Sequence, residues 1–308
     1  MQDSRETSGA MPGARFVDPT VLSRIGNLDL LARSVVDGFI NGLHRAPHFG
    51  ASIDFAEHRG YVPGDDIRRV DWRLYARTDK YYVKQYDADT NTNFAVLLDI
   101  SKSMAFGSQG GVTKIDYARY LAACLGYMAH RQRDRVGIVT FDEDVVSYVP
   151  SSAKHFDVML HTLDQARPVR AGGLRAPLEK IAEHFKRRSV VALISDLYEE
   201  PDEIFEAIKP YRYLGNDLMV FHVLDPAEID FPYRESSRFQ DLETGEEIPI
   251  VPESLLKEYR RLITAHIDAL RTKFSEIRVD YTLVNTARPL DDALFSYLAN
   301  RERTMRVR

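Results

Sequence analysis

Short apolar runs alternate with amphipathic segments from residue 94 to residue 300, and this alternation constrains the fold more than any other feature of the chain. We expect strands at 94–99, 135–141, 144–149, 189–195, 217–224 and 278–284, and helices at 114–131, 153–165, 176–187, 201–213, 253–275 and 290–300. Such alternation predicts an α/β domain with a doubly wound, mostly parallel sheet flanked by helices on both faces. Between the fifth strand and the long helix, the polar run 241–248 predicts a surface hairpin that turns at Thr244-Gly245.

The chain before residue 94 has a different character. Apolar residues recur at helical spacing from Leu28 to Leu43, which predicts one amphipathic helix. The stretch 48–86 is dense in Gly, Asp, Arg and Tyr and favours short strands and turns. Residues 1–20 lack the hydrophobic region of a signal peptide, so we expect a disordered lead-in. Residues 21–93 are therefore predicted to form an N-terminal helix and a β-rich extension.

Composition and charge exclude some classes of partner. The chain has 308 residues, 44% of them hydrophobic, which is enough to bury a core. Its 41 basic and 46 acidic side chains give a net charge of −5, which does not indicate a protein that binds nucleic acid or a membrane surface. No segment approaches the ~20 apolar residues that span a bilayer. We therefore expect a cytoplasmic protein without membrane insertion.

Two of the predicted strands end in carboxylates. The run 94–98 leads into Asp99, and hydroxyls follow at alternate positions, Ser101 and Ser103. The run 190–194 leads into Ser195 and Asp196. If these strands are neighbours where the strand order reverses, both acids face one crevice. Such hard oxygens are the ligands of Mg²⁺ or Mn²⁺, although Asp99 and the serines can instead cap a helix and make local turn bonds.

The Asp-x-Ser-x-Ser pattern at Asp99, Ser101 and Ser103 resembles the metal-ion-dependent adhesion site of von Willebrand factor A-like domains, and Asp196 matches the later aspartate of that family. The resemblance implies a cation at the carboxyl-terminal edge of a Rossmann-like sheet, with an acidic group of a partner completing its coordination. One ligand departs from the family pattern. The family places a threonine after a Gly-Gly-like turn, whereas here Leu174 follows and offers no oxygen. The resemblance therefore implies an incomplete site for Mg²⁺ or Mn²⁺.

The segment before the sheet carries a longer pattern. The residues that form this pattern are His48-Phe49-Gly50, Asp54-Phe55, Glu57, Arg59-Gly60-Tyr61-Val62-Pro63-Gly64-Asp65-Asp66-Ile67-Arg68, Val70-Asp71-Trp72-Arg73, Ala76-Arg77-Thr78 and Tyr82-Val83-Lys84. This pattern is similar to the signature of the DUF58 family, bacterial and archaeal proteins that join such a segment to an A-like domain. The resemblance covers roughly residues 25–225. It implies a partnership with a MoxR-type AAA+ ATPase in the assembly or maturation of other, client proteins.

The segment 59–84 is rich in arginine. It holds seven basic residues (Arg59, Arg68, Arg69, Arg73, Arg77, Lys80, Lys84) and four acids (Asp65, Asp66, Asp71, Asp79). The simplest interpretation is a structural network of ion pairs. A docking surface for an acidic partner is the alternative, and a nucleic-acid patch that stacks bases on Trp72, Tyr75, Tyr81 and Tyr82 is a third. The interleaved acids argue against the nucleic-acid patch.

Several enzyme motifs are absent from the sequence. It contains no Gly-x-x-x-x-Gly-Lys-Ser/Thr loop, no Gly-x-Ser-x-Gly elbow and no His-Glu-x-x-His pair. We therefore expect a non-enzymatic protein-interaction module, an adaptor or co-chaperone of a MoxR-type ATPase that uses a crevice lined by Asp99, Ser101, Ser103 and Asp196. The alternative is a metal-dependent hydrolase or phosphatase that uses Asp99 and Asp196.

Overall fold

The structure, a computed structural model, describes residues 19–45, 57–61, 72–78, 80–85, 92–108, 111–185, 188–235, 237–250 and 252–306. The chain forms two compact units, one of residues 1–15 and 37–90 and the other of residues 16–36 and 91–308. The expected lead-in falls on residues 1–18, outside the described ranges, while Pro19–Leu22 form a short helix, α1. Helix α2 (Leu28–Arg45) follows the amphipathic pattern and belongs partly to each unit.

The first unit contains the signature segment. Strand β1 (Glu57–Gly60) pairs antiparallel with β2 (Tyr82–Gln85), and helix α3 (Trp72–Thr78) lies between them in sequence. Tyr75 stacks on Tyr81 with ring centroids 4.5 Å apart. The expected ion-pair network falls largely on residues outside the described ranges, among them 62–71 and 79.

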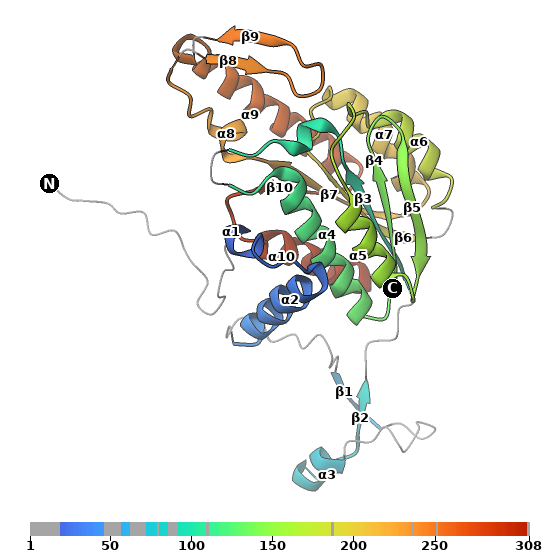
Figure 1. Cartoon of the computed structure of the whole chain (residues 1–308). Helices are drawn as coiled ribbons and strands as arrows, with labels where there is room; N and C mark the ends of the chain where they lie inside the picture. Colours follow the sequence, from blue (N-terminus) through green and yellow to red (C-terminus); the bar gives the residue numbers. More distant parts are fainter. Residues whose placement is uncertain are drawn as a thin grey trace, which may run out of the picture. The chain divides into compact units, whose positions relative to one another are not determined.

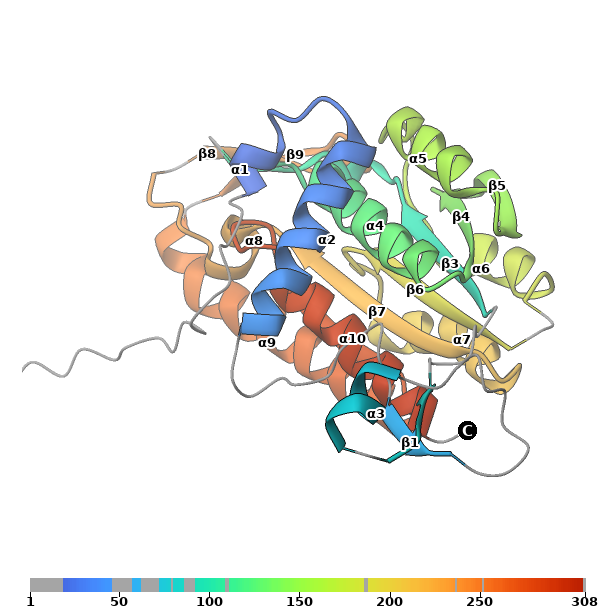
Figure 2. The same ribbon diagram turned by 90° about the horizontal axis from the view of Figure 1, so that it is seen from below.

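The second unit is built on a sheet of six strands in the order β10-β7-β6-β3-β4-β5. Its strands are β3 (Asn93–Asp99), β4 (Arg135–Phe141), β5 (Val145–Ser152), β6 (Ser189–Ser195), β7 (Asp217–Leu224) and β10 (Asp280–Asn285). All neighbouring pairs are parallel except β4 with β5. This arrangement confirms the doubly wound, mostly parallel sheet. Figure 2 shows β7, β6, β3 and β4 side by side.

The central strands are apolar because both of their faces are covered. Every residue of β6 is buried, as is every residue of β3 after Asn93. Helices α4 (Lys114–Arg131), α5 (Phe156–Gln165) and α10 (Asp291–Arg306) pack against one face, where the ring of Phe94 meets that of Tyr297. Helices α6 (Arg175–Ala182), α7 (Pro201–Tyr213) and α9 (Pro252–Glu276) cover the other face with one continuous core.

Five boundaries differ by more than one residue from those expected. Strand β5 ends at Ser152 rather than 149, α5 begins at Phe156 rather than 153, and α10 ends at Arg306 rather than 300. Helix α6 ends at Ala182 rather than at 187, because the backbone turns there and Phe185 returns to the core beneath it. Strand β10 begins at Asp280 rather than 278, because Arg278 adopts a left-handed conformation with φ of 56°. No helix in the described parts of the chain combines the length and the apolar character that crossing a bilayer requires.

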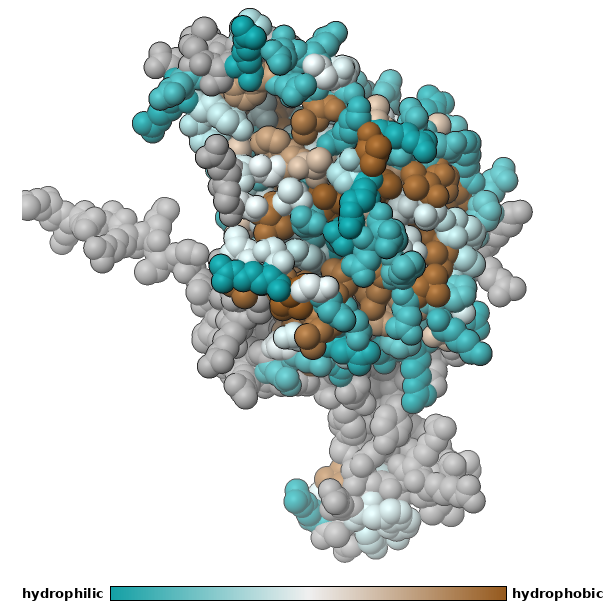
Figure 3. All heavy atoms as spheres, in the orientation of Figure 1, coloured by the Kyte–Doolittle hydropathy of each residue, from teal (hydrophilic) through white to brown (hydrophobic). Residues whose placement is uncertain are grey.

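The expected surface hairpin is present between β7 and α9. Helix α8 (Pro226–Asp230) follows β7, and strands β8 (Ser237–Gln240) and β9 (Glu247–Ile250) then pair antiparallel (Figure 1). The hairpin is attached through Phe239, whose ring stacks on Phe231 with centroids 5.8 Å apart. Its outward side is mostly hydrophilic (Figure 3). The hairpin therefore stands beside the carboxyl-terminal edge of the sheet, near the ends of the strands that carry the predicted site.

Candidate functional site

The strand order reverses between β3 and β6, and Asp99 lies at this point. β3 continues through α4 to its neighbour β4, whereas β6 continues through α7 to β7 on the opposite side. Side chains at the carboxyl ends of two such strands share one crevice. Asp99 is buried, and its Oδ1 accepts a hydrogen bond from the Ser101 backbone N at 2.8 Å. Its Oδ2 accepts from the hydroxyl of Ser195 at 2.6 Å, which ties β3 to β6.

The two hydroxyls of the motif lie together. Ser101 Oγ is 3.0 Å from Ser103 Oγ. Ser101 directly precedes the short helix η2 (Lys102–Ala105), and Ser103 lies within it. The loop before α6 approaches them so closely that a Cβ on Gly172 would lie 2.5 Å from the Cβ of Ser101. Only glycine fits this approach, since real Cβ atoms do not come so near another side chain.

Asp196 is held by a buried lysine. Lys114, the first residue of α4, is fully buried, and its Nζ lies 2.7 Å from Asp196 Oδ2 and 2.7 Å from Glu228 Oε1. The same Nζ lies 4.8 Å from the ring centroid of Tyr198, a cation–π contact. Burial by itself lowers the pKa of Lys114, but the two carboxylates outweigh it and the pKa is raised. The lysine therefore carries its charge inside the protein, where it balances the acids around it.

The turn after β6 adopts an uncommon backbone conformation. Leu197 has a φ of 49° and is fully buried, although leucine rarely adopts the left-handed region. Its N–H donates to Ser195 Oγ at 3.1 Å, and its carbonyl oxygen lies 2.8 Å from His266 Nε2 of α9. These bonds stabilise the strained residue and fix Asp196 directly before it.

Burial controls the protonation of the acids. It raises the pKa of Asp99 to about 7, with the charge of Asp196 adding to the effect and the hydrogen bond from Ser195 opposing it. Burial also raises the pKa of Glu228, although Lys114 opposes this shift. Asp99 therefore changes its charge near neutral pH, which a solvated aspartate does not do.

A further carboxylate enters the site from the hairpin. Glu243 lies in the turn between β8 and β9, and its Oε1 accepts a hydrogen bond from Ser103 N at 2.7 Å. Its Oε2 accepts from Gly172 N at 2.9 Å. Both oxygens of one carboxylate are thus bound by backbone N–H groups of two loops far apart in sequence.

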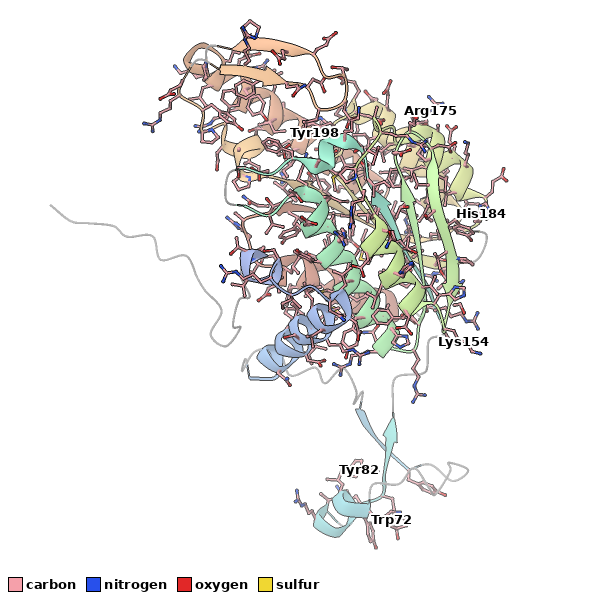
Figure 4. All side chains as sticks on the ribbon, viewed as in Figure 1. Trp72, Tyr82, Lys154, Arg175, His184 and Tyr198 are labelled. Atoms are coloured by element: carbon pink, nitrogen blue, oxygen red, sulfur yellow. The ribbon has the colours of Figure 1, made fainter. Side chains whose placement is uncertain are left out.

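These side chains surround a crevice of about 510 Å³. Both acidic and aromatic side chains line it, and Tyr198 is labelled at this edge of the sheet in Figure 4. Its lining includes Asp99, Ser103, Asp196, Glu228, Phe231 and Glu243. The volume lies in the range of sites that hold a small ligand or the side chains of a partner.

The donor set fits a divalent cation in part. Asp99, Ser101 and Ser103 offer hard oxygens within one loop, as Mg²⁺ or Mn²⁺ prefers. Asp196 is already bonded to an ammonium group, and Leu174, buried in the core beside α6, supplies no oxygen. Within the described ranges, no three His, Cys, Asp or Glu side chains gather in a way that could hold a metal ion. A cation here would depend on the serine hydroxyls and on Asp99.

All four predicted site residues therefore line or adjoin one crevice, with β3 and β6 as neighbours, while their role as metal ligands stays a prediction. Lys114, Glu228 and Glu243 were not predicted from the sequence. Two further acids were not predicted either, namely Asp142 and Asp225, which follow β4 and β7 and are buried. The rule that found Asp99, an acid directly after an apolar strand, would have found these two. Asp225 has a structural role, since it caps α8.

The fold and the site define a doubly wound α/β protein with an acid-lined crevice at the reversal point of its sheet. The chain belongs to the DUF58 family, described as proteins of unknown function, whose model matches residues 57–269. The match confirms the family resemblance, begins at residue 57 rather than near residue 25, and extends into α9. Similar proteins include the uncharacterized proteins Mb1516 of Mycobacterium bovis and Rv1480 of Mycobacterium tuberculosis, each 28% identical over 265 residues, with 83% of this chain and 82% of the relative covered.

Solved structures to which the chain is similar include the conserved hypothetical protein BatB from Bacteroides thetaiotaomicron, at 16% identity and a TM-score of 0.47, covering 70% of this chain and 100% of that one. An aerotolerance-related membrane protein from Bacteroides fragilis is 18% identical with a TM-score of 0.45, covering 66% and 96%. The SpRpn10 VWA domain is 12% identical with a TM-score of 0.40, covering 66% and 93%.

Proposed function

We propose that this protein is a non-enzymatic interaction module whose crevice docks a protein partner. Within this proposal the partner is a MoxR-type AAA+ ATPase of the cytoplasm, and the protein acts as its adaptor or co-chaperone in the assembly or maturation of client proteins. We expect an ATPase as the partner because the family resemblance implies one. The chain itself has no phosphate-binding loop, so a partner must supply any nucleotide hydrolysis.

One observation carries the proposal: the acids of the crevice are already bound by groups of the protein itself. Asp196 is paired with Lys114, and Asp99 accepts from Ser195 and Ser101. A general base or a nucleophile needs an unoccupied lone pair directed at a substrate atom, and these contacts occupy lone pairs of both acids. Acids arranged in this way give a fixed pattern of charge and hydrogen-bonding groups, which suits recognition better than catalysis.

A divalent cation is part of the proposal. Asp99, Ser101 and Ser103 would hold Mg²⁺ or Mn²⁺, and the ion would supply a positive charge for an acidic group of the partner. The chain's own residues would orient that charge, because Ser195 and the Ser101 backbone fix the carboxylate of Asp99.

The competing function is metal-dependent hydrolysis of phosphoesters through Asp99 and Asp196. The specific observation in its favour is the raised pKa of Asp99, about 7, which is the range of a general acid or base. The ion pair between Asp196 and Lys114 argues against this competing function.

Binding to a purified MoxR-type ATPase from the same cells tests the proposal. Asp99→Asn removes the charge at nearly the same volume, and Asp142→Asn is the matched control, another buried acid at a strand end. We expect Asp99→Asn to weaken binding at least about tenfold and Asp142→Asn to leave it nearly unchanged, as for the loss of one buried charge at an interface. Equal binding by all three proteins, or none by the wild type, would contradict the docking function.

An assay with generic phosphoesters and added Mg²⁺ or Mn²⁺ tests the competing function in the same preparations. Turnover that requires the metal and disappears in Asp99→Asn would replace the docking function with hydrolysis. Turnover that persists in Asp99→Asn would come from a contaminant, because the proposed reaction requires that carboxylate.

A further inference from the structure

The hairpin places its own acid in the crevice, and the rest of the turn is exposed. Among residues 241–247, all of which the structure describes, Glu243 alone is half-buried. Its carboxylate bridges the backbone N–H groups of Ser103 and Gly172, which we name the amide pair. The amide pair belongs to the loop after β3 and to the loop before α6, so neither loop alone could bind the carboxylate in this way.

The turn is built to present this side chain. Asp241 Oδ1 accepts hydrogen bonds from Glu243 N at 2.7 Å and from Thr244 N at 3.3 Å, and Asp241 O accepts from Gly245 N at 2.8 Å. Gly245 has a φ of 77°, which glycine adopts without strain. Asp241 thus fixes the backbone conformation of Glu243 through hydrogen bonds within the turn itself.

The base of the hairpin is attached to the body of the domain by aromatic rings. Phe239 stacks on Phe231 and contacts Tyr233 edge-on with centroids 4.8 Å apart. Phe231 in turn lies 4.6 Å from the ring of Tyr259 on α9. The ring contacts at the base therefore attach the hairpin to the domain separately from the hydrogen bonds of Glu243 to the amide pair.

Resting on the proposed docking function, we infer that Glu243 is a built-in occupant of the crevice and that the amide pair is a binding site for a carboxylate. A partner that carries an exposed Asp or Glu side chain docks by displacing Glu243 from the amide pair. The two N–H donors are fixed by their loops, and they bind a carboxylate whether it comes from this chain or from another. The hairpin thus sets the affinity of the crevice, because every acidic partner competes with Glu243.

A small free acid that matches the deleted part of the Glu243 side chain can serve as the probe in a test. Glu243→Ala removes the Cγ methylene and the carboxylate, a group equivalent to acetate, so free acetate is the acid that matches the deleted group. The amide resonances of Ser103 and Gly172 report on the site directly. Glu246→Ala is the matched control, because Glu246 is an exposed acid of the same turn.

We expect amide exchange at Ser103 and Gly172 to be at least about tenfold faster in Glu243→Ala than in the wild type, and unchanged in Glu246→Ala. Acetate at millimolar concentration restores the wild-type resonances and slow exchange in Glu243→Ala. The neutral isostere acetamide does not, and wild-type protein responds to neither. Equal exchange in the wild type and Glu243→Ala, no response to acetate, or an equal response to acetamide would each overturn the inference.

Glu243→Gln provides a second variant that keeps the size of the side chain. It is expected to show the faster amide exchange without a change in far-UV circular dichroism, and unchanged exchange in this folded variant would also overturn the inference. Because these measurements need no ATPase, they separate the two proposals. If Glu243→Ala binds acetate but the wild type binds no ATPase, the carboxylate site stands and the proposed partner is wrong. If the wild type binds the ATPase but Glu243→Ala does not bind acetate, only the role of Glu243 is wrong.

Discussion

The Nζ of Lys114 lies 2.7 Å from Asp196 Oδ2, and both side chains are almost completely buried. A second carboxylate, that of Glu228, lies 2.7 Å from the same nitrogen. One internal cation therefore serves two acids at the edge of the crevice. This arrangement is costly to disturb, because taking away the lysine leaves two negative charges in a poorly solvated place.

Lys114→Met is expected to lower the free energy of unfolding by about 3–5 kcal/mol, the typical cost of removing one partner of a buried ion pair. Urea denaturation followed by circular dichroism measures this loss. Lys180→Met is the control, because Lys180 forms an exposed ion pair with Asp144. Losing this pair should lower the free energy of unfolding by less than about 1 kcal/mol. A loss in Lys114→Met no larger than that in the control would contradict the structural role of the lysine.

The fold was predictable because the sheet is covered on both faces. Burial on both sides requires continuous apolar runs, and these marked β3 and β6 to within a residue. The acids at the strand ends were predictable for the same reason, since Asp99 interrupts such a run. The hairpin turn was predictable from Thr244-Gly245, because the glycine must adopt a positive φ.

The contacts that complete the site were not predictable from local pattern. Lys114 looks like any lysine in the first turn of a helix, and its burial depends on Glu228, 114 residues away along the chain. Glu243 looks like a solvated acid in a turn, and its partner Ser103 is 140 residues away. Pairings over such distances depend on how α8 and the hairpin fold back onto the sheet edge.

Gly172→Ala should destabilise the protein by about 1–3 kcal/mol, since its new Cβ would lie 2.5 Å from that of Ser101 and force two loops apart. The measurement is again urea denaturation, together with the amide resonance of residue 172. Gly173→Ala is the natural comparison, because the nearest atom to its Cβ would be 3.9 Å away. If the two alanine variants were equally stable, the close approach of these loops would be excluded.

His222 should make the protein sensitive to acid. Burial lowers its pKa to about 3, and the nearby His266 and Lys114 act in the same direction. Below pH 6.5 His222 is protonated in the unfolded chain, whereas in the folded chain it stays neutral down to about pH 3. As the pH falls through this window, the free energy of unfolding therefore decreases by about 1.4 kcal/mol per pH unit. Asp99 contributes with the opposite sign between pH 3.8 and about 7, because its folded pKa is raised.

Comparison with His222→Gln isolates the histidine, because the contribution of Asp99 is common to both proteins. Unfolding free energies measured from pH 7 to pH 4 should fall more steeply in the wild type than in the variant. The partner of His222 Nδ1 is the hydroxyl of Tyr281 at 2.7 Å, which a glutamine can also contact. Parallel pH profiles for the two proteins would show that His222 takes up its proton normally in the folded state.

Mn²⁺ affinity should rise between pH 6 and pH 8, because a metal ion competes with the proton on Asp99, whose pKa is raised to about 7 by burial and by the charge of Asp196. Electron paramagnetic resonance of free Mn²⁺ measures the affinity without any assay of function. Asp99→Asn and Ser103→Ala should each weaken binding at least about tenfold, whereas Asp142→Asn, with its acid at the end of another strand, should not. Mn²⁺ binding that is independent of pH and unchanged in Asp99→Asn would place the ion elsewhere on the protein and leave the Asp99 crevice as a site that works without a metal.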